Sequence, residues 1–239
     1  MHVGVRVPRR TVIVTSATHD DGMQAVAVLT SGGLDSAVLA ADLLRDGHPV
    51  QPMYLRFGLA WEATEEAHLR RFLASLDSPE LRPLVVIDVP IARLYDAHWS
   101  VSGVGVPDDR TEDEAVYLPG RNLLLLVQPA VWCALHDIHT IALGTLKGNP
   151  FSDSTREFFD QFAALAQRAM GHDFDILTPY ADLTKTEVLE RGRGFALEHT
   201  FSCIDPRDGH HCGRCNKCAE RRGAFIASSV EDATVYASR

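Results

Sequence analysis

The sequence predicts an α/β protein with a doubly wound, mostly parallel sheet and a small metal-binding lobe at its C-terminus. Short apolar runs alternate with amphipathic segments, which is typical of βαβ units. A Ser-Gly-Gly turn follows the first apolar run, and four of the five cysteines lie between positions 203 and 218. With 239 residues, 46% of them hydrophobic and 23% charged, the chain can bury a sizeable core.

The elements follow one another in regular alternation. The apolar run at 24–30 predicts the first strand, and helically spaced apolar residues at 34–45 predict the first helix. The segment 99–117 is long, polar and acidic, and we expect a loop there that is functional or disordered. Further strands are expected at 50–57, 84–89 and 140–144, and further helices at 63–76, 122–135, 155–170 and 184–191.

Charge and hydropathy exclude several classes of protein. The net charge of -9 disfavours a nucleic-acid partner, since phosphate binding needs clustered positive charge. No apolar run approaches the ~20 residues of a membrane span. The apolar block at 11–14 is shorter than the ~7–15 residues of a secretory signal. We therefore expect a cytoplasmic protein with no membrane partner.

The segment Ser31-Gly32-Gly33-Leu34-Asp35-Ser36 lies between a predicted strand and a predicted helix. Two glycines let the backbone approach a phosphate closely, and successive N–H groups at a helix start form an anion-binding concavity. Asp35 is costly beside a phosphate unless a cation bridges them, so the motif predicts Mg²⁺. The alternative is a strand–turn–helix corner capped by serine and aspartate. The segment matches neither the Walker loop nor the dinucleotide-binding fingerprint.

Cys203, Cys212, Cys215 and Cys218 have the spacing C-x8-C-x2-C-x2-C. Four thiolates suit tetrahedral Zn²⁺, and a closed shell of four protein ligands is structural rather than catalytic. We expect one structural zinc per chain, in a lobe over 196–239 that follows a nucleotide-binding domain over 1–195. A redox pair or an iron–sulfur cluster is the alternative. Five basic residues near the cysteines either offset the thiolate charge or face a substrate anion: Arg207, Arg214, Lys217, Arg221 and Arg222.

The glycine-containing segment resembles the pyrophosphate loop of the N-type ATP pyrophosphatases. Further segments resemble the 7-cyano-7-deazaguanine synthase family of that group, and they occur in the family's order. They are Tyr117-Leu118-Pro119-Gly120-Arg121-Asn122, then Thr178-Pro179 with Leu183-Thr184-Lys185-Thr186-Glu187, and then Phe201-Ser202-Cys203 with the three later cysteines, Arg221 and Ala224-Phe225.

The resemblance implies a Rossmann-like ligase of the queuosine pathway. It would use ATP as co-substrate, Mg²⁺ and ammonia to convert 7-carboxy-7-deazaguanine, a deazapurine carboxylate, to the nitrile. The resemblance implies that the catalytic residues are Asp35, Arg121 and Lys185. Arg121 offers a planar donor fork, and Lys185 offers charge for a leaving pyrophosphate. ATP binding falls to Ser31, Gly32, Gly33, Leu34, Asp35, Ser36 and Asn122.

Two segments depart from the family pattern. Phe57-Gly58-Leu59 stands where the family usually has Tyr-Gly-Gln, and the segment 145–155 differs from the family's substrate segment. We expect Asp153 to bind the amino-pyrimidine edge of the acceptor and Arg156 to pair with its carboxylate. The alternative is that Asp153 or Ser154 caps the following helix. A different purine-like carboxylate or a protein-linked acceptor also stays open, as does the choice between a monomer and a homodimer.

Two other functions remain as alternatives. A tRNA-thiolation enzyme of the same fold would need a reactive cysteine near the loop, whereas Cys133 lies in an apolar helix. A zinc-containing regulator that only senses nucleotide would bind ATP without converting it to AMP.

Overall fold

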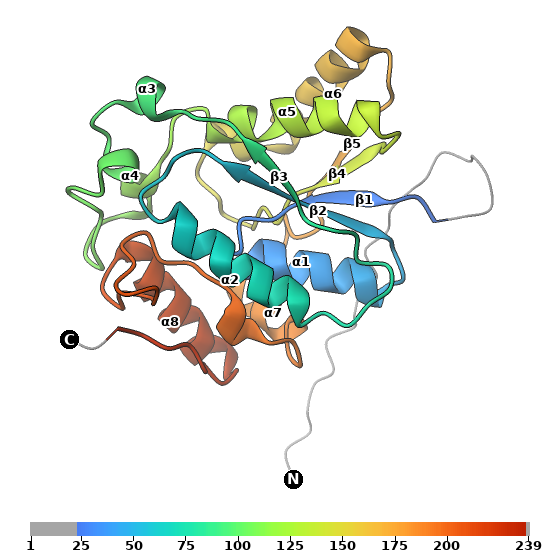
Figure 1. Cartoon of the computed structure of the whole chain (residues 1–239). Coiled ribbons are helices and arrows are strands. Elements are labelled where there is room, and N and C mark those ends of the chain that lie inside the picture. Colours follow the sequence, from blue (N-terminus) through green and yellow to red (C-terminus); the bar gives the residue numbers. More distant parts are fainter. Residues whose placement is uncertain (1–22, 238–239) are drawn as a thin grey trace.

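The computed structural model describes residues 23–237, so the segment at 11–14 lies outside the described residues. Figure 1 shows a sheet with helices on both of its faces. The five strands are all parallel, in the order β3-β2-β1-β4-β5, which confirms the predicted doubly wound sheet. The strands are β1 (Val26–Leu29), β2 (Val50–Arg56), β3 (Val85–Asp88), β4 (Thr140–Ala142) and β5 (Asp175–Leu177).

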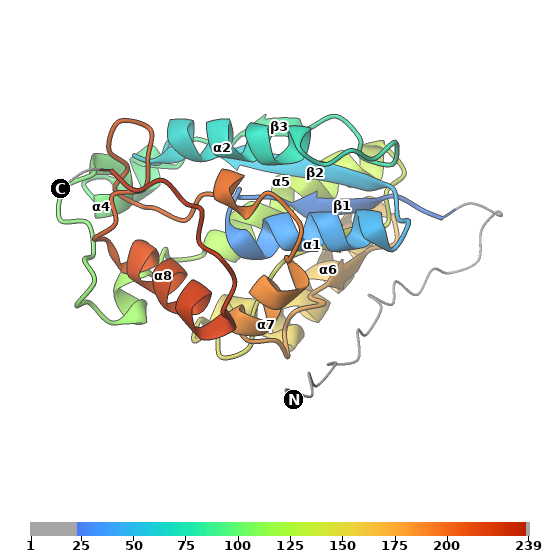
Figure 2. The same ribbon diagram turned by 90° about the horizontal axis from the view of Figure 1, so that it is seen from below.

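The helices form two layers. The helices α1, α2 and α7 cover one face of the sheet, and α5 and α6 cover the other (Figures 1 and 2). None of the helices described between residues 23 and 237 is long and apolar enough to cross a membrane. The α-helices are α1 (Leu34–Arg45), α2 (Glu62–Ala74), α3 (Ala92–Tyr95), α4 (Trp99–Ser102), α5 (Arg121–Leu135), α6 (Arg156–Met170), α7 (Lys185–Arg191) and α8 (Asn216–Ser228). Three 3₁₀ turns are η1 (Asp113–Val116), η2 (Ser152–Ser154) and η3 (Leu197–His199).

The central strand is buried on both faces, which explains its continuous apolar run. Val26 and Val28 pack into the core beneath α1 and α7, while Ala27 and Leu29 pack toward α5 and α6. This alternation follows from the two-residue period of a strand. The first strand thus carries both halves of the hydrophobic core.

Besides the short helices α3 and α4 and the 3₁₀ turns, two elements were not among those expected from sequence. The strand β5 has only three residues and opens with an exposed aspartate, so it gives almost no apolar signal. The helix α8 is rich in charge, and its apolar residues are few. The loop expected at 99–117 does contain irregular backbone, but α4 and η1 lie within it.

The C-terminal lobe shares the core of the main sheet domain. Ala224 and Phe225 of α8 belong to the same buried cluster as Leu34 of α1 and Val188 of α7. The domain boundary between 195 and 196 therefore stays a prediction, and the lobe packs directly onto the first helix of the sheet.

The carboxyl ends of β1 and β4 meet at Gly144. A Cβ atom at this position would lie 2.9 Å from the backbone carbon of Asp35 and 3.0 Å from the nitrogen of Ser36. Real Cβ atoms almost never approach backbone so closely. Only glycine lets the chain after β4 touch the start of α1.

We expect Gly144→Ala to lower the free energy of unfolding by about 1–3 kcal/mol, because neither backbone can move aside without displacing a strand or a helix. Urea denaturation measures the change. The control is Gly223→Ala in α8, where no atom lies within 4 Å of the new methyl group. That variant should gain up to ~1 kcal/mol from reduced backbone entropy of the unfolded chain. Unchanged stability of Gly144→Ala would contradict the close approach.

Candidate active site

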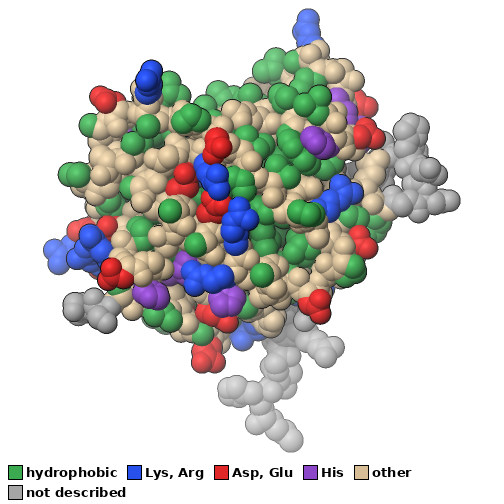
Figure 3. Space-filling view, in the orientation of Figure 1, with side chains coloured by type: hydrophobic (Ala, Val, Ile, Leu, Met, Phe, Trp, Pro, Cys, Tyr) green, Lys and Arg blue, Asp and Glu red, His purple; other side chains and the backbone are tan. Residues whose placement is uncertain are grey.

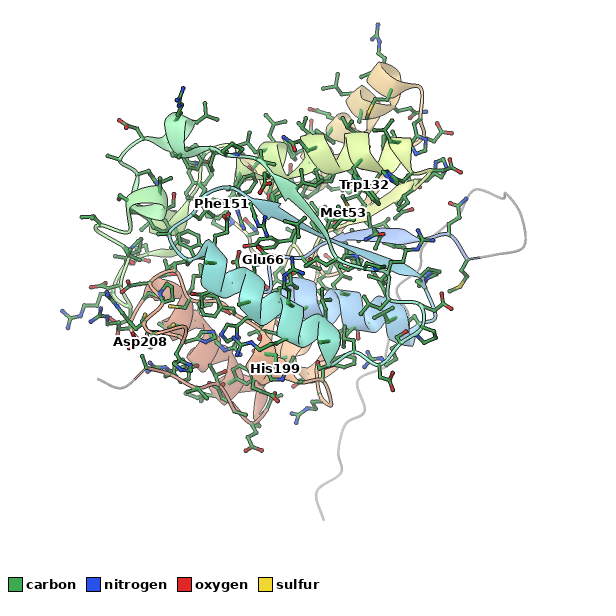
Figure 4. The ribbon with its side chains drawn as sticks, in the orientation of Figure 1. Met53, Glu66, Trp132, Phe151, His199 and Asp208 are labelled. Carbon is green, nitrogen blue, oxygen red and sulfur yellow. The ribbon has the colours of Figure 1, made fainter. Side chains whose placement is uncertain are left out.

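A cleft of about 540 Å³ opens at the carboxyl ends of β1 and β4. The strand order reverses between these two strands, and doubly wound sheets bind ligands at this point. Met53 of β2 and Phe151, which follows β4, line the cleft from opposite sides of the reversal and are labelled in Figure 4. The predicted loop and most of the predicted site residues lie along the same cleft.

The loop 31–36 leaves the start of α1 open to a ligand. Gly33 is the N-cap of α1 and supplies no side chain to its first turn. Ser31 and Ser36 are held together, since the Ser31 N–H donates to Ser36 Oγ at 3.2 Å. Gly32 has φ +76°, and a Cβ there would lie 3.2 Å from the backbone oxygen of Glu65. Uncapped N–H groups at a helix start attract anions, which suits a phosphate.

Lys185 and Asp35 form the central ion pair of the cleft. Lys185 Nζ lies 2.6 Å from Asp35 Oδ2, and Thr184 and Glu187 fix the lysine at the first turn of α7 through a capping box. Burial alone would lower the pKa of Lys185, but Asp35 and Glu220 raise it, so the amine stays charged. Burial raises the pKa of Asp35, and Lys185 opposes that shift.

The chemistry of Asp35 fits a divalent cation. Its Oδ1 atom is buried and has no hydrogen-bond partner among the described residues, while Oδ2 is held by Lys185. An unpartnered carboxylate oxygen beside a helix start is a hard oxygen donor of the kind that Mg²⁺ prefers. Asp35 is therefore the residue that would hold Mg²⁺ against a phosphate.

Asn122 and Asp153 tie α5 to the segment after β4. The Asn122 backbone N–H donates to Asp153 Oδ2 at 3.0 Å, and Asn122 Nδ2 donates to the Asp153 backbone oxygen at 2.9 Å. Arg121 lines the cleft, and its buried Nε has no partner among the described residues. This arrangement leaves the Nε donor of Arg121 available at the cleft.

The structure separates the two residues expected to bind the acceptor. Asp153 caps α5, whereas Thr155 accepts from the Phe158 N–H and caps the following helix. Arg156 is exposed, pairs with Asp160 at 2.7 Å, and does not line the cleft. The part of the segment 145–155 that does line the cleft is 145–151. Arg156 is placed outside because it opens α6, and its side chain points along that helix to the next turn.

Sequence analysis missed several cleft residues on α2 and in the long loop. Glu65 lies at the cleft and accepts a 2.8 Å hydrogen bond from Tyr54 Oη. Burial is the main cause that raises its pKa, to about 7. Trp61 and Trp99 stack with ring centroids 5.7 Å apart and form an apolar wall. Trp61 and Glu65 could have been predicted from the sequence, because acidic and aromatic residues gather right after the second strand.

The four cysteines converge as a metal site requires. Their sulfurs all lie within 4.8 Å of one another, with Cys203 to Cys215 at 3.8 Å and Cys212 to Cys218 at 4.0 Å. A tetrahedron with Zn–S bonds of ≈ 2.3 Å has S···S edges of about 3.8 Å. The backbone N–H groups of residues 205 and 212 also donate to Cys203 Sγ, which suits a thiolate. The cluster fits one tetrahedral ion.

The cysteine-containing lobe at 196–239, called the metal lobe below, is hydrogen-bonded directly to the loop 31–36, called the phosphate loop. The Phe201 N–H donates to the Gly32 backbone oxygen at 2.7 Å. Arg221 is buried and donates to Thr200 Oγ1 and to the Leu197 backbone oxygen, so it ties the lobe together. His211 is also buried, and its Nε2 accepts from the Ser202 N–H rather than facing the cysteines. The lobe thus forms one wall of the cleft.

Two observations bear on the alternative of a tRNA-thiolation enzyme, namely the burial of Cys133 and the distribution of surface charge. Cys133 is fully buried, and burial raises the pKa of its thiol to about 12, so it is poorly suited to sulfur transfer. On the face shown in Figure 3, the basic and acidic side chains are interspersed rather than gathered into a basic surface.

Comparison with known proteins matches residues 24–229 to the family described as queuosine biosynthesis protein QueC. A 7-cyano-7-deazaguanine synthase of Azoarcus sp. is 29% identical over 224 residues, covering 89% of this chain and 96% of that protein. The enzyme of the same name from Solidesulfovibrio magneticus is 29% identical over 233 residues, covering 90% and 97%.

A solved structure titled as a 4-thiouridine synthetase–RNA complex with bound ATP shows a looser similarity. It is 13% identical, with a TM-score of 0.46, and the match covers 86% of this chain and 50% of that one.

We expect Cys215→Ser to abolish metal binding and to destabilise the lobe, because structural zinc contributes ~10–16 kcal/mol in small zinc-finger peptides. Elemental analysis of the purified wild type should give one zinc per chain, and the variant should give none. Cys133→Ala is the control and should keep its zinc, since Cys133 is not among the four cysteines whose sulfurs converge. Iron in the wild type, or a stable and fully folded Cys215→Ser variant, would contradict the assignment.

We expect Glu65→Gln to stabilise the protein more at pH 8 than at pH 5. An acid whose folded pKa is raised contributes stability below its ordinary value of 4.5, and this contribution is lost as the pH rises to about 7. Glutamine has no charge to bury, so the variant should gain about 1–3 kcal/mol relative to wild type across this range.

Urea denaturation at the two pH values measures the gain. The control is the neighbouring Glu66→Gln, because hydrogen bonds from Arg56 lower the pKa of Glu66 and give a shift of opposite sign. If the difference in unfolding free energy between Glu65→Gln and wild type is the same at both pH values, Glu65 is not a buried acid with a raised pKa.

Proposed function

The chain belongs to the family of queuosine biosynthesis protein QueC, and from this premise we propose that it is an ATP-dependent ligase that adenylates and amidates a deazapurine carboxylate. We infer that the substrate is 7-carboxy-7-deazaguanine, since the relatives bear the name 7-cyano-7-deazaguanine synthase. The observation that carries the proposal is the cleft that places the uncapped start of α1 beside the Asp35–Lys185 pair.

The proposed chemistry begins with ATP bound along the loop 31–36. The acceptor carboxylate attacks the α-phosphorus, the bond to the β-phosphate oxygen breaks, and pyrophosphate leaves. Lys185 neutralises charge that develops on the leaving group, and the Arg121 guanidinium holds phosphate or carboxylate oxygens. Mg²⁺, held by Asp35, would supply further positive charge to the phosphates when bound.

The second half of the reaction displaces AMP. Ammonia attacks the activated carbonyl carbon, which gives the amide and releases AMP. Activation of the amide oxygen in the same way, followed by loss of AMP with that oxygen, gives the nitrile. Asn122 is placed to orient a nucleotide or an acceptor because its backbone is fixed by Asp153.

The acceptor end of the cleft is mainly apolar and aromatic. Trp61 and Trp99 form one wall, and Phe151 lines the cleft with the ring of Tyr117 packed on it at a centroid distance of 5.0 Å. Flat aromatic surfaces suit a planar bicyclic base. The segment 145–151 completes this end, and we propose that it selects the acceptor in place of Arg156.

We expect the purified protein, supplied with Mg-ATP, ammonium and 7-carboxy-7-deazaguanine, to release AMP and pyrophosphate and to form the nitrile. Mass spectrometry follows the products. Asp35→Ala should reduce turnover at least a hundredfold, because it removes the carboxylate proposed to join Mg²⁺ to the phosphates.

Asp160→Ala removes the same charge from the exposed side of α6 and should turn over normally. Release of ADP instead of AMP, or normal turnover by Asp35→Ala, would contradict the mechanism. ATP binding with no AMP formed in the presence of acceptor would favour the nucleotide-sensing alternative.

A further inference from the structure

The first two turns of α8 carry two charged residues into the cleft. Lys217 and Glu220 both line it, although they belong to the metal lobe. Cys215 is the N-cap of α8 and Cys218 lies within its first turn, so the metal cluster fixes where this turn sits. Figure 2 shows α8 next to α7, the helix that begins with Lys185.

These residues extend the central ion pair into a chain of four charges. Lys185 Nζ lies 2.6 Å from Asp35 Oδ2 and 3.3 Å from Glu220 Oε1. Glu220 Oε2 lies 2.7 Å from Lys217 Nζ. The two carboxylate oxygens of Glu220 therefore each hold one ammonium group.

The net charge of these four side chains decides whether they attract or repel a polyphosphate. Lys185 alone faces two carboxylates, so Asp35, Lys185 and Glu220 together carry one net negative charge beside the phosphate loop. Such a group repels phosphate at short range. Lys217 cancels that charge and places a second ammonium group at the same wall of the cleft. An ordinary surface ion pair would add little, but these two side chains are only 29% and 34% exposed.

We propose that Lys217 is a second phosphate-binding lysine, supplied to the site by the metal lobe, and that Glu220 positions both lysines for the pyrophosphate. The ligand chemistry is that of a polyphosphate with bound Mg²⁺. The inference rests on the proposed function, because it assigns the residues that bind ATP before and pyrophosphate after adenylation.

The test is calorimetric titration of the zinc-loaded protein with Mg-pyrophosphate and with Mg-ATP, which needs no acceptor. Lys217→Met keeps the aliphatic stem of the side chain and should weaken pyrophosphate binding about tenfold, the loss of one charge-assisted contact. Lys217→Arg should restore most of the affinity. Arg214→Met is the matched control in the same lobe, since Arg214 is 65% exposed and pairs with Asp205; it should stay within about twofold of wild type.

A second variant separates positioning from binding. Glu220→Gln removes an anion from beside the phosphates, so pyrophosphate affinity should be retained, while AMP formation should fall about tenfold because Lys185 loses a charged partner. A fall in affinity without a fall in the rate of AMP formation would overturn the role given to Glu220.

The outcomes distinguish this inference from the proposed function. Wild-type affinity in Lys217→Met, with zinc content unchanged, overturns the inference and leaves the proposed function standing. Loss of zinc from Lys217→Met also overturns it, because the residue would then serve the lobe and not the ligand. A wild type that binds neither ATP nor pyrophosphate overturns both.

Discussion

The contact between Lys185 and Asp35 is the interaction on which the site depends. It joins two helices whose first turns are 150 positions apart in sequence and closes them over the same strand ends. Charge buried without a partner is expensive, so each group needs the other in the absence of a ligand. A polyphosphate with its cation offers each group a new partner of opposite charge. The pair thus fixes the first turns of α1 and α7 relative to each other at the cleft.

The metal lobe is part of this site and not only an appendage. Phe201 bonds to the phosphate loop from one side of the lobe, and α8 reaches Lys185 from the other. Between these two contacts lie the four cysteines, which converge on one ion-sized space. Phe201, Ile204 and Phe225 of the lobe are buried, and a metal held by the cysteines would add further stability to these two contacts. Metal binding and phosphate binding are therefore expected to be coupled through the same few residues.

The sequence sufficed for the fold because its strongest signals were local. A continuous apolar strand followed by two glycines specifies β1, the loop and α1 with little help from distant residues. The same holds for the cysteine spacing and for the capping box at Thr184. The sequence did not reveal β5, which is held by pairing with β4 rather than by its own three residues. From the sequence we expected Arg156 in the site, whereas the structure has it exposed on α6. Linear spacing does not show which side of a helix start faces the cleft.

The acceptor end shows why Asp153 still matters although it caps a different helix from the one expected. By accepting from the Asn122 N–H, its carboxylate fixes the first turn of α5, and the same turn carries Arg121 into the cleft. The segment after β4 is therefore coupled to the nucleotide side through α5, whichever acceptor it contacts. Phe151, which lines the cleft, packs on Tyr117 from the preceding loop, so that loop also contacts the segment after β4. The ion pair between α1 and α7 contains no residue of the segment 145–151, so substitutions in this segment leave that pair intact.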